Sequence, residues 1–121
     1  MDKDAKIQEM KEIVALFSRE RDWEQFHNPK DLGVALGIEV SELMEHFRYK
    51  TNEEIEALLN NALKKKEVSD ELADVFWMVL RLSEVCKIDL SDALKEKVKE
   101  AAGKYPVEKV KGNSQKYTHY K

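Results

Sequence analysis

Two pairs of acidic residues stand out because each pair is spaced three residues apart within an apolar segment. Glu39 and Glu42 occur in LGIEVSELMEHF, and Glu71 and Asp74 occur in SDELADVFWMVL. Residues three apart lie on the same side of an α-helix, so each segment would present two carboxylates together. Carboxylate oxygens are ligands that hard divalent cations such as Mg²⁺ prefer. The pattern therefore predicts either a metal site built from two helices or two ordinary solvent-exposed acidic edges.

The helical positions of these residues favour a buried acidic site. With ~100° of rotation per residue, Glu39 falls inside the apolar stripe of its helix and Glu42 on the flank, whereas Glu45 points toward solvent. On the later helix Glu71 falls inside the stripe and Asp74 lies just beyond it. Ionised carboxylates on a packing face need a positive partner. We expect Mg²⁺, with Mn²⁺ as a substitute, to fill that role between the two helices.

Acidic pairs with this spacing also arise by chance. The chain has 24 acidic residues, and the pairs Glu9 with Glu12 and Glu53 with Glu56 read as solvated helix faces. Spacing and composition alone leave the metal site and the solvated faces as open alternatives.

The elements that must position these carboxylates are helices. The chain has 121 residues, about one domain, with 37% charged residues and only 4 Gly and 2 Pro, a composition typical of helical proteins. Asn28 before Pro29, and Thr51 three residues before Glu54, are typical N-cap patterns. We expect an all-α, four-to-five-helix bundle with helices over residues 4–20, 29–49, 52–64 and 67–87. A last helix, capped by Asp89 or Ser91, would end near Gly103 with Leu94, Val98, Ala101 and Ala102 inward, followed by an extended tail over 106–121.

Several classes of protein do not fit the composition. No stretch approaches the ~20 apolar residues of a membrane span, and the N-terminal segment lacks the pattern of a signal peptide. The single Cys86 reads as a small core residue in a reducing compartment. The net charge of -3 argues against binding of a nucleic-acid polymer. We expect a cytoplasmic protein.

Longer stretches carry a resemblance to a known family. The segments ERDWEQFHNPKDLGVALGIEVSELMEHFRYKT, DELADVFWMVLRL and KYPVEKVKG resemble, in order and over nearly the whole chain, the MazG-like superfamily of all-α nucleoside triphosphate pyrophosphohydrolases. Within it they are most similar to the dCTP pyrophosphatase type. The resemblance implies one domain over 1–121 and assembly as a homotetramer (a dimer of dimers) or a dimer. It also implies Mg²⁺-dependent hydrolysis of (deoxy)nucleoside triphosphates, preferably dCTP or related or modified pyrimidine nucleotides, to monophosphate and pyrophosphate, as nucleotide-pool house-cleaning.

The resemblance also implies roles for individual residues. Glu39, Glu42, Glu71 and Asp74 would hold Mg²⁺, and Glu39 or Glu42 would also orient or deprotonate the attacking water. The residues implied to contact the nucleotide are Trp23, Glu24, Gln25, Phe26, His27, Tyr49, Met78, Lys97, Lys104 and Tyr105. The alternatives are that Trp23 and Phe26 only brace a helix corner, that Met78 is a core residue, and that the lysines are solvated.

Four departures from the dCTP pyrophosphatase pattern bear on the nucleotide site. Val14 stands in place of a histidine and Ala101 in place of an asparagine. Both of these changes remove a hydrogen-bonding group, and such groups supply most discrimination between bases. Met78 stands in place of a tyrosine, and Tyr49 stands in place of a tryptophan, a change that keeps an aromatic ring for stacking. A broad-specificity dNTP or NTP diphosphatase is therefore one alternative, and a non-catalytic helical interaction module is another. The four intact carboxylates favour an enzyme.

Overall fold

The computed structural model describes residues 1–114 and 118, and every regular element in them is helical. The chain divides into two compact units, Met1–Lys87 and Ile88–Lys121, and each is described by itself. The predicted all-α class is confirmed. The prediction of a single domain over 1–121 stays a prediction.

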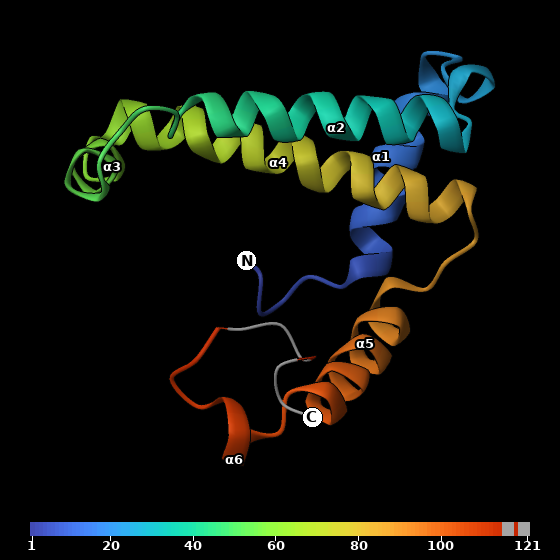
Figure 1. Ribbon diagram of the computed structural model, residues 1–121. Coiled ribbons are helices and arrows are strands. Elements are labelled where there is room, and N and C mark those ends of the chain that lie inside the picture. Colours follow the sequence, from blue (N-terminus) through green and yellow to red (C-terminus); the bar gives the residue numbers. More distant parts are fainter. Residues whose placement is uncertain (115–117, 119–121) are drawn as a thin grey trace. The chain divides into compact units, whose positions relative to one another are not determined.

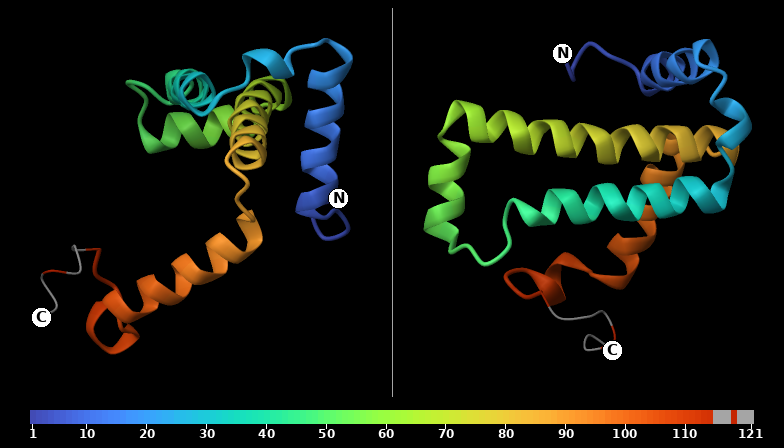
Figure 2. Two further views of the ribbon diagram at one scale, coloured as in Figure 1. Left: turned by 90° about the vertical axis from the view of Figure 1, so that its right-hand side faces the viewer. Right: turned by 90° about the horizontal axis from the view of Figure 1, so that it is seen from above.

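The first unit is built around two long antiparallel helices (Figures 1 and 2). Its elements are α1 (Ile7–Glu20), a short 3₁₀ turn (Glu24–Phe26), α2 (Pro29–Glu45), α3 (Asn52–Leu59) and α4 (Ala62–Val85). Helix α4 packs along α2 and also contacts α1 and α3. The 3₁₀ turn lies at the corner between α1 and α2. Both acidic pairs therefore lie on helices that pack on one another.

Side-chain caps fix where the helices begin. The Asn28 Oδ1 accepts a hydrogen bond from the Asp31 amide (2.9 Å), and Thr51 Oγ1 accepts one from the Glu54 amide (3.1 Å), so both predicted caps are confirmed. Asn61 caps α4 in the same way, through the Lys64 amide at 3.0 Å. Because of this cap, α3 ends at Leu59 rather than 64, and α4 begins at Ala62 rather than 67.

Two further helix boundaries differ from the prediction. Helix α1 begins at Ile7 rather than residue 4, and α2 ends at Glu45 rather than 49. After α2 the chain turns through Tyr49, whose φ is 62°. A residue with this φ cannot continue a right-handed α-helix, in which φ is close to −63°. Tyr49 is 88% exposed, and its hydroxyl accepts a hydrogen bond from Arg48 Nη2 at 2.8 Å.

The core of the first unit is small. Among the described residues, the buried apolar side chains are Val14 and Ala15 on α1, Leu32 on α2, and Val68 and Leu80 on α4. Cys86, predicted to be a core residue, is exposed. That prediction is wrong because α4 ends at Val85, which places the cysteine beyond the packed part of the helix.

The second unit contains α5 (Leu90–Lys104) and the four-residue α6 (Val107–Val110). Asp89 caps α5, because its Oδ1 accepts a hydrogen bond from the Asp92 amide at 2.9 Å. Leu94 and Val98 are 65% and 61% exposed, so the expectation that they point inward is wrong. The other described helix of this unit is too short to cover them. The tail also differs from the extended form expected, because α6 lies within it, and residues 115–117 and 119–121 are outside the described part.

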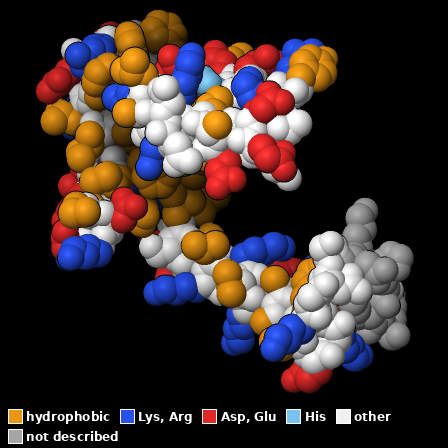
Figure 3. Space-filling view, turned by 90° about the vertical axis from the view of Figure 1, so that its left-hand side faces the viewer, with side chains coloured by type: hydrophobic (Ala, Val, Ile, Leu, Met, Phe, Trp, Pro, Cys, Tyr) orange, Lys and Arg blue, Asp and Glu red, His pale blue; other side chains and the backbone are white. Residues whose placement is uncertain are grey.

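Large hydrophobic side chains are exposed on the first unit. They include Ile13, Leu16, Ile38, Met44 and Leu72, each at least half exposed, and Figure 3 shows such side chains gathered over the first unit. In the described part of the chain, no helix is long and apolar enough to cross a bilayer.

Candidate metal and nucleotide site

Three of the four predicted metal ligands meet where α2 packs on α4. Glu39, Glu42 and Glu71 each contribute a carboxylate oxygen, and these oxygens lie within 4.8 Å of one another. We call these three residues the carboxylate cluster. Glu39 and Glu71 are half-buried and Glu42 is exposed, as the helical positions predicted. Glu45 points away and pairs with Arg48 Nη1 at 3.1 Å.

The electrostatics of the carboxylate cluster are unfavourable without a cation. One oxygen of Glu39 and one of Glu71 are buried and have no hydrogen-bond partner among the described residues. Burial, reinforced by the charge of Glu42, raises the pKa of both Glu39 and Glu71. The charge of Asp74 acts in the same direction. His46 Nε2 lies 3.9 Å from Glu71 Oε1, beyond hydrogen-bond range.

These residues fit a hard divalent cation. The donor atoms are all carboxylate oxygens, the type that Mg²⁺ and Mn²⁺ favour. Added positive charge at this point would offset the raised pKa values of Glu39 and Glu71 and give the two unpartnered oxygens a partner. A divalent cation would supply that charge and satisfy the buried oxygens together.

Asp74, the fourth predicted ligand, is not one of the residues that lie within 4.8 Å of one another. It lies one turn beyond Glu71 on α4 and lines a cavity of about 240 Å³. Its charge nevertheless contributes to the raised pKa of Glu39 and Glu71. Asp74 therefore connects the carboxylate cluster with the adjoining cavity.

The cavity beside Asp74 has largely aromatic walls, and we call it the aromatic pocket. Phe17, Trp23 and Trp77 line it, with Leu32 and Met78. The Phe17 ring makes edge contacts with Trp23 (centroids 5.7 Å apart) and with Trp77 (4.9 Å). Flat rings at a partly exposed cavity are suited to stacking on a nucleobase.

The polar lining of the aromatic pocket comes from Ser18, His27, Asp74 and Arg81. Arg81 Nε donates to His27 Nδ1 at 3.1 Å, and Arg81 Nη1 pairs with Glu84 Oε1 at 3.2 Å. Burial, with the Arg81 charge, lowers the pKa of His27. His27 is therefore neutral near pH 7.

Of the predicted nucleotide segment, the structure brings only Trp23 and His27 to the aromatic pocket. Glu24 lies 3.7 Å from Arg19 Nε, and the Gln25 amide donates to Asp22 within the same turn (2.9 and 3.0 Å). Phe26 is 63% exposed. Met78, from α4, does line the pocket.

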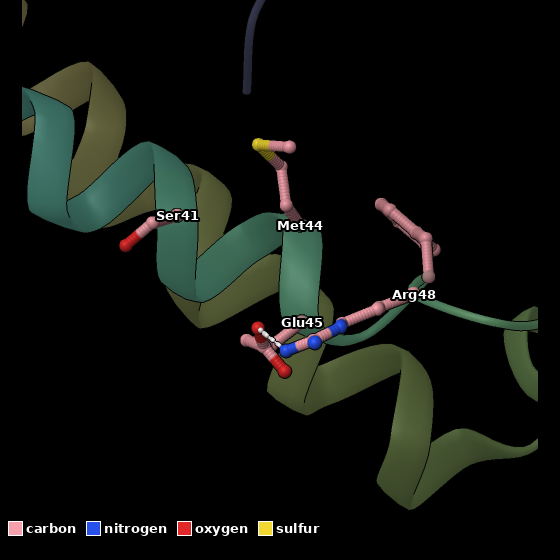
Figure 4. A pocket seen from close by; sticks show the side chains of 5 residues that line it. Ser41, Met44, Glu45 and Arg48 are labelled. Atoms are coloured by element: carbon pink, nitrogen blue, oxygen red, sulfur yellow. Dashed lines mark hydrogen bonds and ion pairs between the residues drawn. The ribbon is translucent and has the colours of Figure 1, made fainter.

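Tyr49 is not at the aromatic pocket. A separate hollow of about 490 Å³ lies beside the end of α2, lined by Ser41, Met44, Glu45, Phe47 and Arg48. Figure 4 shows Arg48 and Glu45 paired there. No residue of the carboxylate cluster lines this hollow, so we do not assign it to the candidate site.

Lys97, Lys104 and Tyr105 belong to the second unit, on α5 and directly after it. Both lysines pair with Glu100, at 3.5 Å and 3.1 Å. Their contact with a triphosphate stays a prediction. Of the substituted positions, Val14 is a buried core residue rather than a pocket residue.

Five residues that line the pocket were missed in the sequence: Phe17, Ser18, Leu32, Trp77 and Arg81. Trp77 and Arg81 are four apart on α4, so they share one side of the helix. An arginine within the apolar run FWMVLRL was the available signal, since a charged residue there needs a partner if it is buried.

Comparison with known proteins identifies the family. The MazG-like family model matches residues 34–119. The dCTP pyrophosphatases 1 of Bos taurus and Homo sapiens are each 35% identical over 112 residues, which is 93% of this chain and 66% of theirs. A pyrophosphatase crystal structure from Archaeoglobus fulgidus matches with a TM-score of 0.76 and 36% identity, covering 82% of this chain and 91% of that one. This chain belongs to the MazG-like family.

Proposed function

We propose that this chain is a Mg²⁺-dependent nucleoside triphosphate pyrophosphohydrolase that acts on dCTP or a related pyrimidine nucleotide. The relatives named dCTP pyrophosphatase 1 support the reaction, and this chain spans 66% of their length. The main structural support is that the carboxylate cluster adjoins an aromatic pocket through Asp74. A cation site beside a base-sized cavity is what a nucleotide polyphosphate requires.

Glu39, Glu42 and Glu71 would hold the metal ion, with Asp74 next to them. When bound, Mg²⁺ supplies positive charge against the phosphate oxygens and lowers the pKa of a coordinated water. The chain itself supplies the orientation, because α2 and α4 fix the carboxylates on a packed helix pair.

In the reaction, a water oxygen forms a bond to the α-phosphorus as the bond from that phosphorus to the bridging oxygen breaks. Pyrophosphate leaves and the nucleoside monophosphate remains. Glu39 or Glu42 orients the water and accepts its proton, which then passes to solvent. The aromatic pocket holds the base with Trp23 and Trp77, so that the α-phosphate stays near the carboxylates.

The test is a panel of dCTP, TTP, dUTP, dATP, dGTP and CTP, with and without Mg²⁺, on the wild type and on Glu42→Gln. We expect pyrophosphate and monophosphate as products, the fastest turnover for a pyrimidine nucleotide, and loss of turnover in the variant. Release of orthophosphate from the γ position would contradict the proposal. Equal rates over the panel would indicate the broad-specificity diphosphatase.

The non-catalytic interaction module makes opposite predictions. It would show no turnover, and Mg²⁺ would not raise its melting temperature. A protein that binds Mg²⁺ only in its native state must be stabilised by it, so a thermal scan with MgCl₂ against EDTA separates the two hypotheses even before a substrate is found.

Assembly into a homo-oligomer, a dimer or tetramer, is part of the proposal. The exposed hydrophobic residues of the first unit support it, as does an apolar groove of about 630 Å³ between the N-terminal segment and α4 that is lined by Met10, Leu72, Phe76 and others. Sedimentation equilibrium measures the mass directly. A monomer at micromolar concentration would contradict this part.

A further inference from the structure

Of the ion-pair contacts among the described residues, only one involves the carboxylate cluster, and it comes from His46. The His46 Nε2 lies 3.9 Å from Glu71 Oε1. The lysines and arginine nearest to the cluster in the sequence pair with acids outside it: Lys64 with Glu67, Lys66 with Asp70, and Arg48 with Glu45. The proposed function gives this histidine no role, although it lies next to a proposed metal ligand.

The two carboxylate oxygens of Glu71 have different surroundings. Oε2 is buried and has no hydrogen-bond partner among the described residues, whereas Oε1 is the oxygen in contact with His46. A carboxylate that binds a metal through one oxygen commonly accepts a hydrogen bond from the protein at the other. The surroundings of Glu71 fit that division, with His46 at Oε1 and Oε2 left for a cation.

The position of His46 is fixed by the end of α2. The residue directly follows α2 and keeps helical dihedral angles, with φ of -66° and ψ of -24°. Its amide donates to the Leu43 carbonyl at 3.2 Å. Because residues four apart share one side of a helix, His46 lies on the same side as Glu42. Its side chain is 21% exposed, so the ring lies partly buried beside the carboxylate cluster.

Glu71 has the most to gain from a positioning partner. Glu39 and Glu42 share the backbone of α2, so their spacing is set by that helix alone, whereas Glu71 is the member that α4 contributes. A glutamate side chain has three rotatable bonds, and holding it in one conformation costs entropy. A donor at Oε1 restricts the rotation of the carboxylate and so reduces the cost of ordering it when a cation binds.

His46 is not itself a member of the carboxylate cluster. Its ring nitrogens are not among the ligand atoms that all lie within 4.8 Å of one another. Its distance from Glu71 Oε1 exceeds that of a direct hydrogen bond by less than about 1 Å. The Glu71 side chain is 24% exposed, so a small rotation of its carboxylate closes this gap. The geometry thus favours a contact with one ligand over direct binding of the ion.

We propose that His46 is a positioning residue that donates from Nε2 to Glu71 Oε1 and thereby holds Glu71 for binding of the divalent cation through its other oxygen. An imidazole offers an N–H at Nε2 in its Nε2 tautomer and in its charged form. The inference rests on the proposed function, because it requires the cation at the carboxylate cluster. Replacement of such a partner typically weakens metal binding by roughly 10- to 100-fold.

The test is a Mn²⁺ titration of the full chain, in which electron paramagnetic resonance measures the free ion. It compares wild type with His46→Leu, which has no donor, and with His46→Gln, which keeps an N–H at a similar reach and is the matched control. We expect the Kd for Mn²⁺ to rise roughly 10- to 100-fold in His46→Leu and to stay within about threefold in His46→Gln. A Kd in His46→Leu within about twofold of wild type would overturn the proposal.

A spectroscopic measurement separates positioning from direct metal binding. A histidine nitrogen bonded to Mn²⁺ gives a nitrogen coupling in pulsed electron paramagnetic resonance, and we expect none in the wild-type complex. A coupling that disappears in His46→Leu would make His46 a ligand and overturn the positioning role.

The Mg²⁺ dependence of turnover separates positioning from a general structural effect. We expect His46→Leu to need more Mg²⁺ for half-maximal turnover, by the same factor as its loss of Mn²⁺ affinity, and to recover turnover at saturating Mg²⁺. Turnover that stays low at saturating Mg²⁺ would contradict the proposal. If circular dichroism shows that His46→Leu does not fold, His46→Met also lacks a donor, and the same results are expected of it.

The Mn²⁺ titration also distinguishes failure of this inference from failure of the proposed function. Binding by wild type with an unchanged Kd in His46→Leu would contradict only the role of His46. A wild-type protein that binds no Mn²⁺ would contradict the metal site of the proposed function, and the role of His46 with it.

Discussion

A carboxylate oxygen of Glu39 on α2 lies within 4.8 Å of a carboxylate oxygen of Glu71 on α4, although both side chains are acidic. Each residue also has a buried oxygen without a hydrogen-bond partner in the described part of the chain. Helix packing alone would not favour this arrangement, since like charges at such a distance repel. The consequences can be measured on the metal-free protein.

The first prediction concerns the pH dependence of stability without metal. Because the folded pKa of Glu71 is raised above the unfolded value of about 4.3, the folded state binds more protons between those two values. The free energy of unfolding therefore falls as pH rises through the folded pKa. Urea unfolding in EDTA should show a steeper loss between pH 4.5 and 7.5 in wild type than in Glu71→Gln.

Glu53→Gln, on the exposed side of α3, is the control for that comparison and should follow the wild-type curve. Addition of Mg²⁺ at pH 7.5 should restore the lost stability in wild type. Identical pH slopes in wild type and Glu71→Gln would contradict the electrostatic cost assigned to the carboxylate cluster.

The second prediction concerns catalysis. Glu42→Gln should lower kcat/KM by roughly 100-fold or more, because one of the charges that position the metal and substrate is lost. It should also abolish the rise in melting temperature with Mg²⁺. Glu45→Gln, three residues further along, removes a carboxylate that pairs with Arg48 outside the cluster, and its activity should stay within twofold of wild type. Equal activity of Glu42→Gln and Glu45→Gln would exclude a role for the cluster.

The third prediction concerns His27. Its folded pKa is lowered, so below the unfolded value of about 6.5 the unfolded state binds the extra proton. Stability from the Arg81 to His27 hydrogen bond is present above pH 6.5 and is lost as pH falls toward the folded pKa. Replacement by His27→Gln leaves an acceptor for Arg81 that does not titrate. The difference in unfolding free energy between wild type and this variant should shrink or reverse between pH 7.5 and 5.5. A constant difference would contradict the pH-dependent stabilisation assigned to the Arg81 to His27 hydrogen bond.

The fourth prediction concerns the corner that holds Trp23 and His27. Asn28→Ala should lower the free energy of unfolding by about 1 kcal/mol, the usual cost of losing an N-cap. Asn28→Ser keeps an acceptor for the Asp31 amide and should retain most of that stability. Denaturant titration of the three proteins measures both values. A Ser variant as unstable as the Ala variant would show that the second bond, from Asn28 Nδ2 to Asp31 at 2.7 Å, matters more than the cap.

Local chemistry explains which parts of the structure could be predicted from the sequence. The caps at Asn28 and Thr51 were predicted because each depends on a side chain and an amide three residues apart. The same rule applies to Asn61, which was missed because it lies inside a polar stretch that was assigned to one longer helix. The meeting of Glu39 and Glu71 followed from helical periodicity on two amphipathic helices.

The apolar run around Arg81 indicates that this residue needs a partner, but the partner itself could not be predicted, because His27 is 54 residues away in the sequence. Hydrophobic periodicity indicates which face of a helix is apolar. It does not indicate which other helix packs against that face or against any other face. The exposure of Leu94 and Val98 has a related origin. Their pattern indicates an apolar face, and the pattern contains no information on whether the same chain supplies the cover.

The left-handed backbone at Tyr49 offers a way to distinguish selection for stability from selection for nucleotide turnover. Glycine adopts a φ of 62° without the crowding of a Cβ, a relief of about 1 kcal/mol. In a library randomised at this codon, selection for thermal stability alone should enrich glycine. Selection for nucleotide turnover should keep an aromatic ring if the exposed side chain meets a nucleotide. Sequencing the two pools would therefore show whether the tyrosine ring or only the turn is under selection.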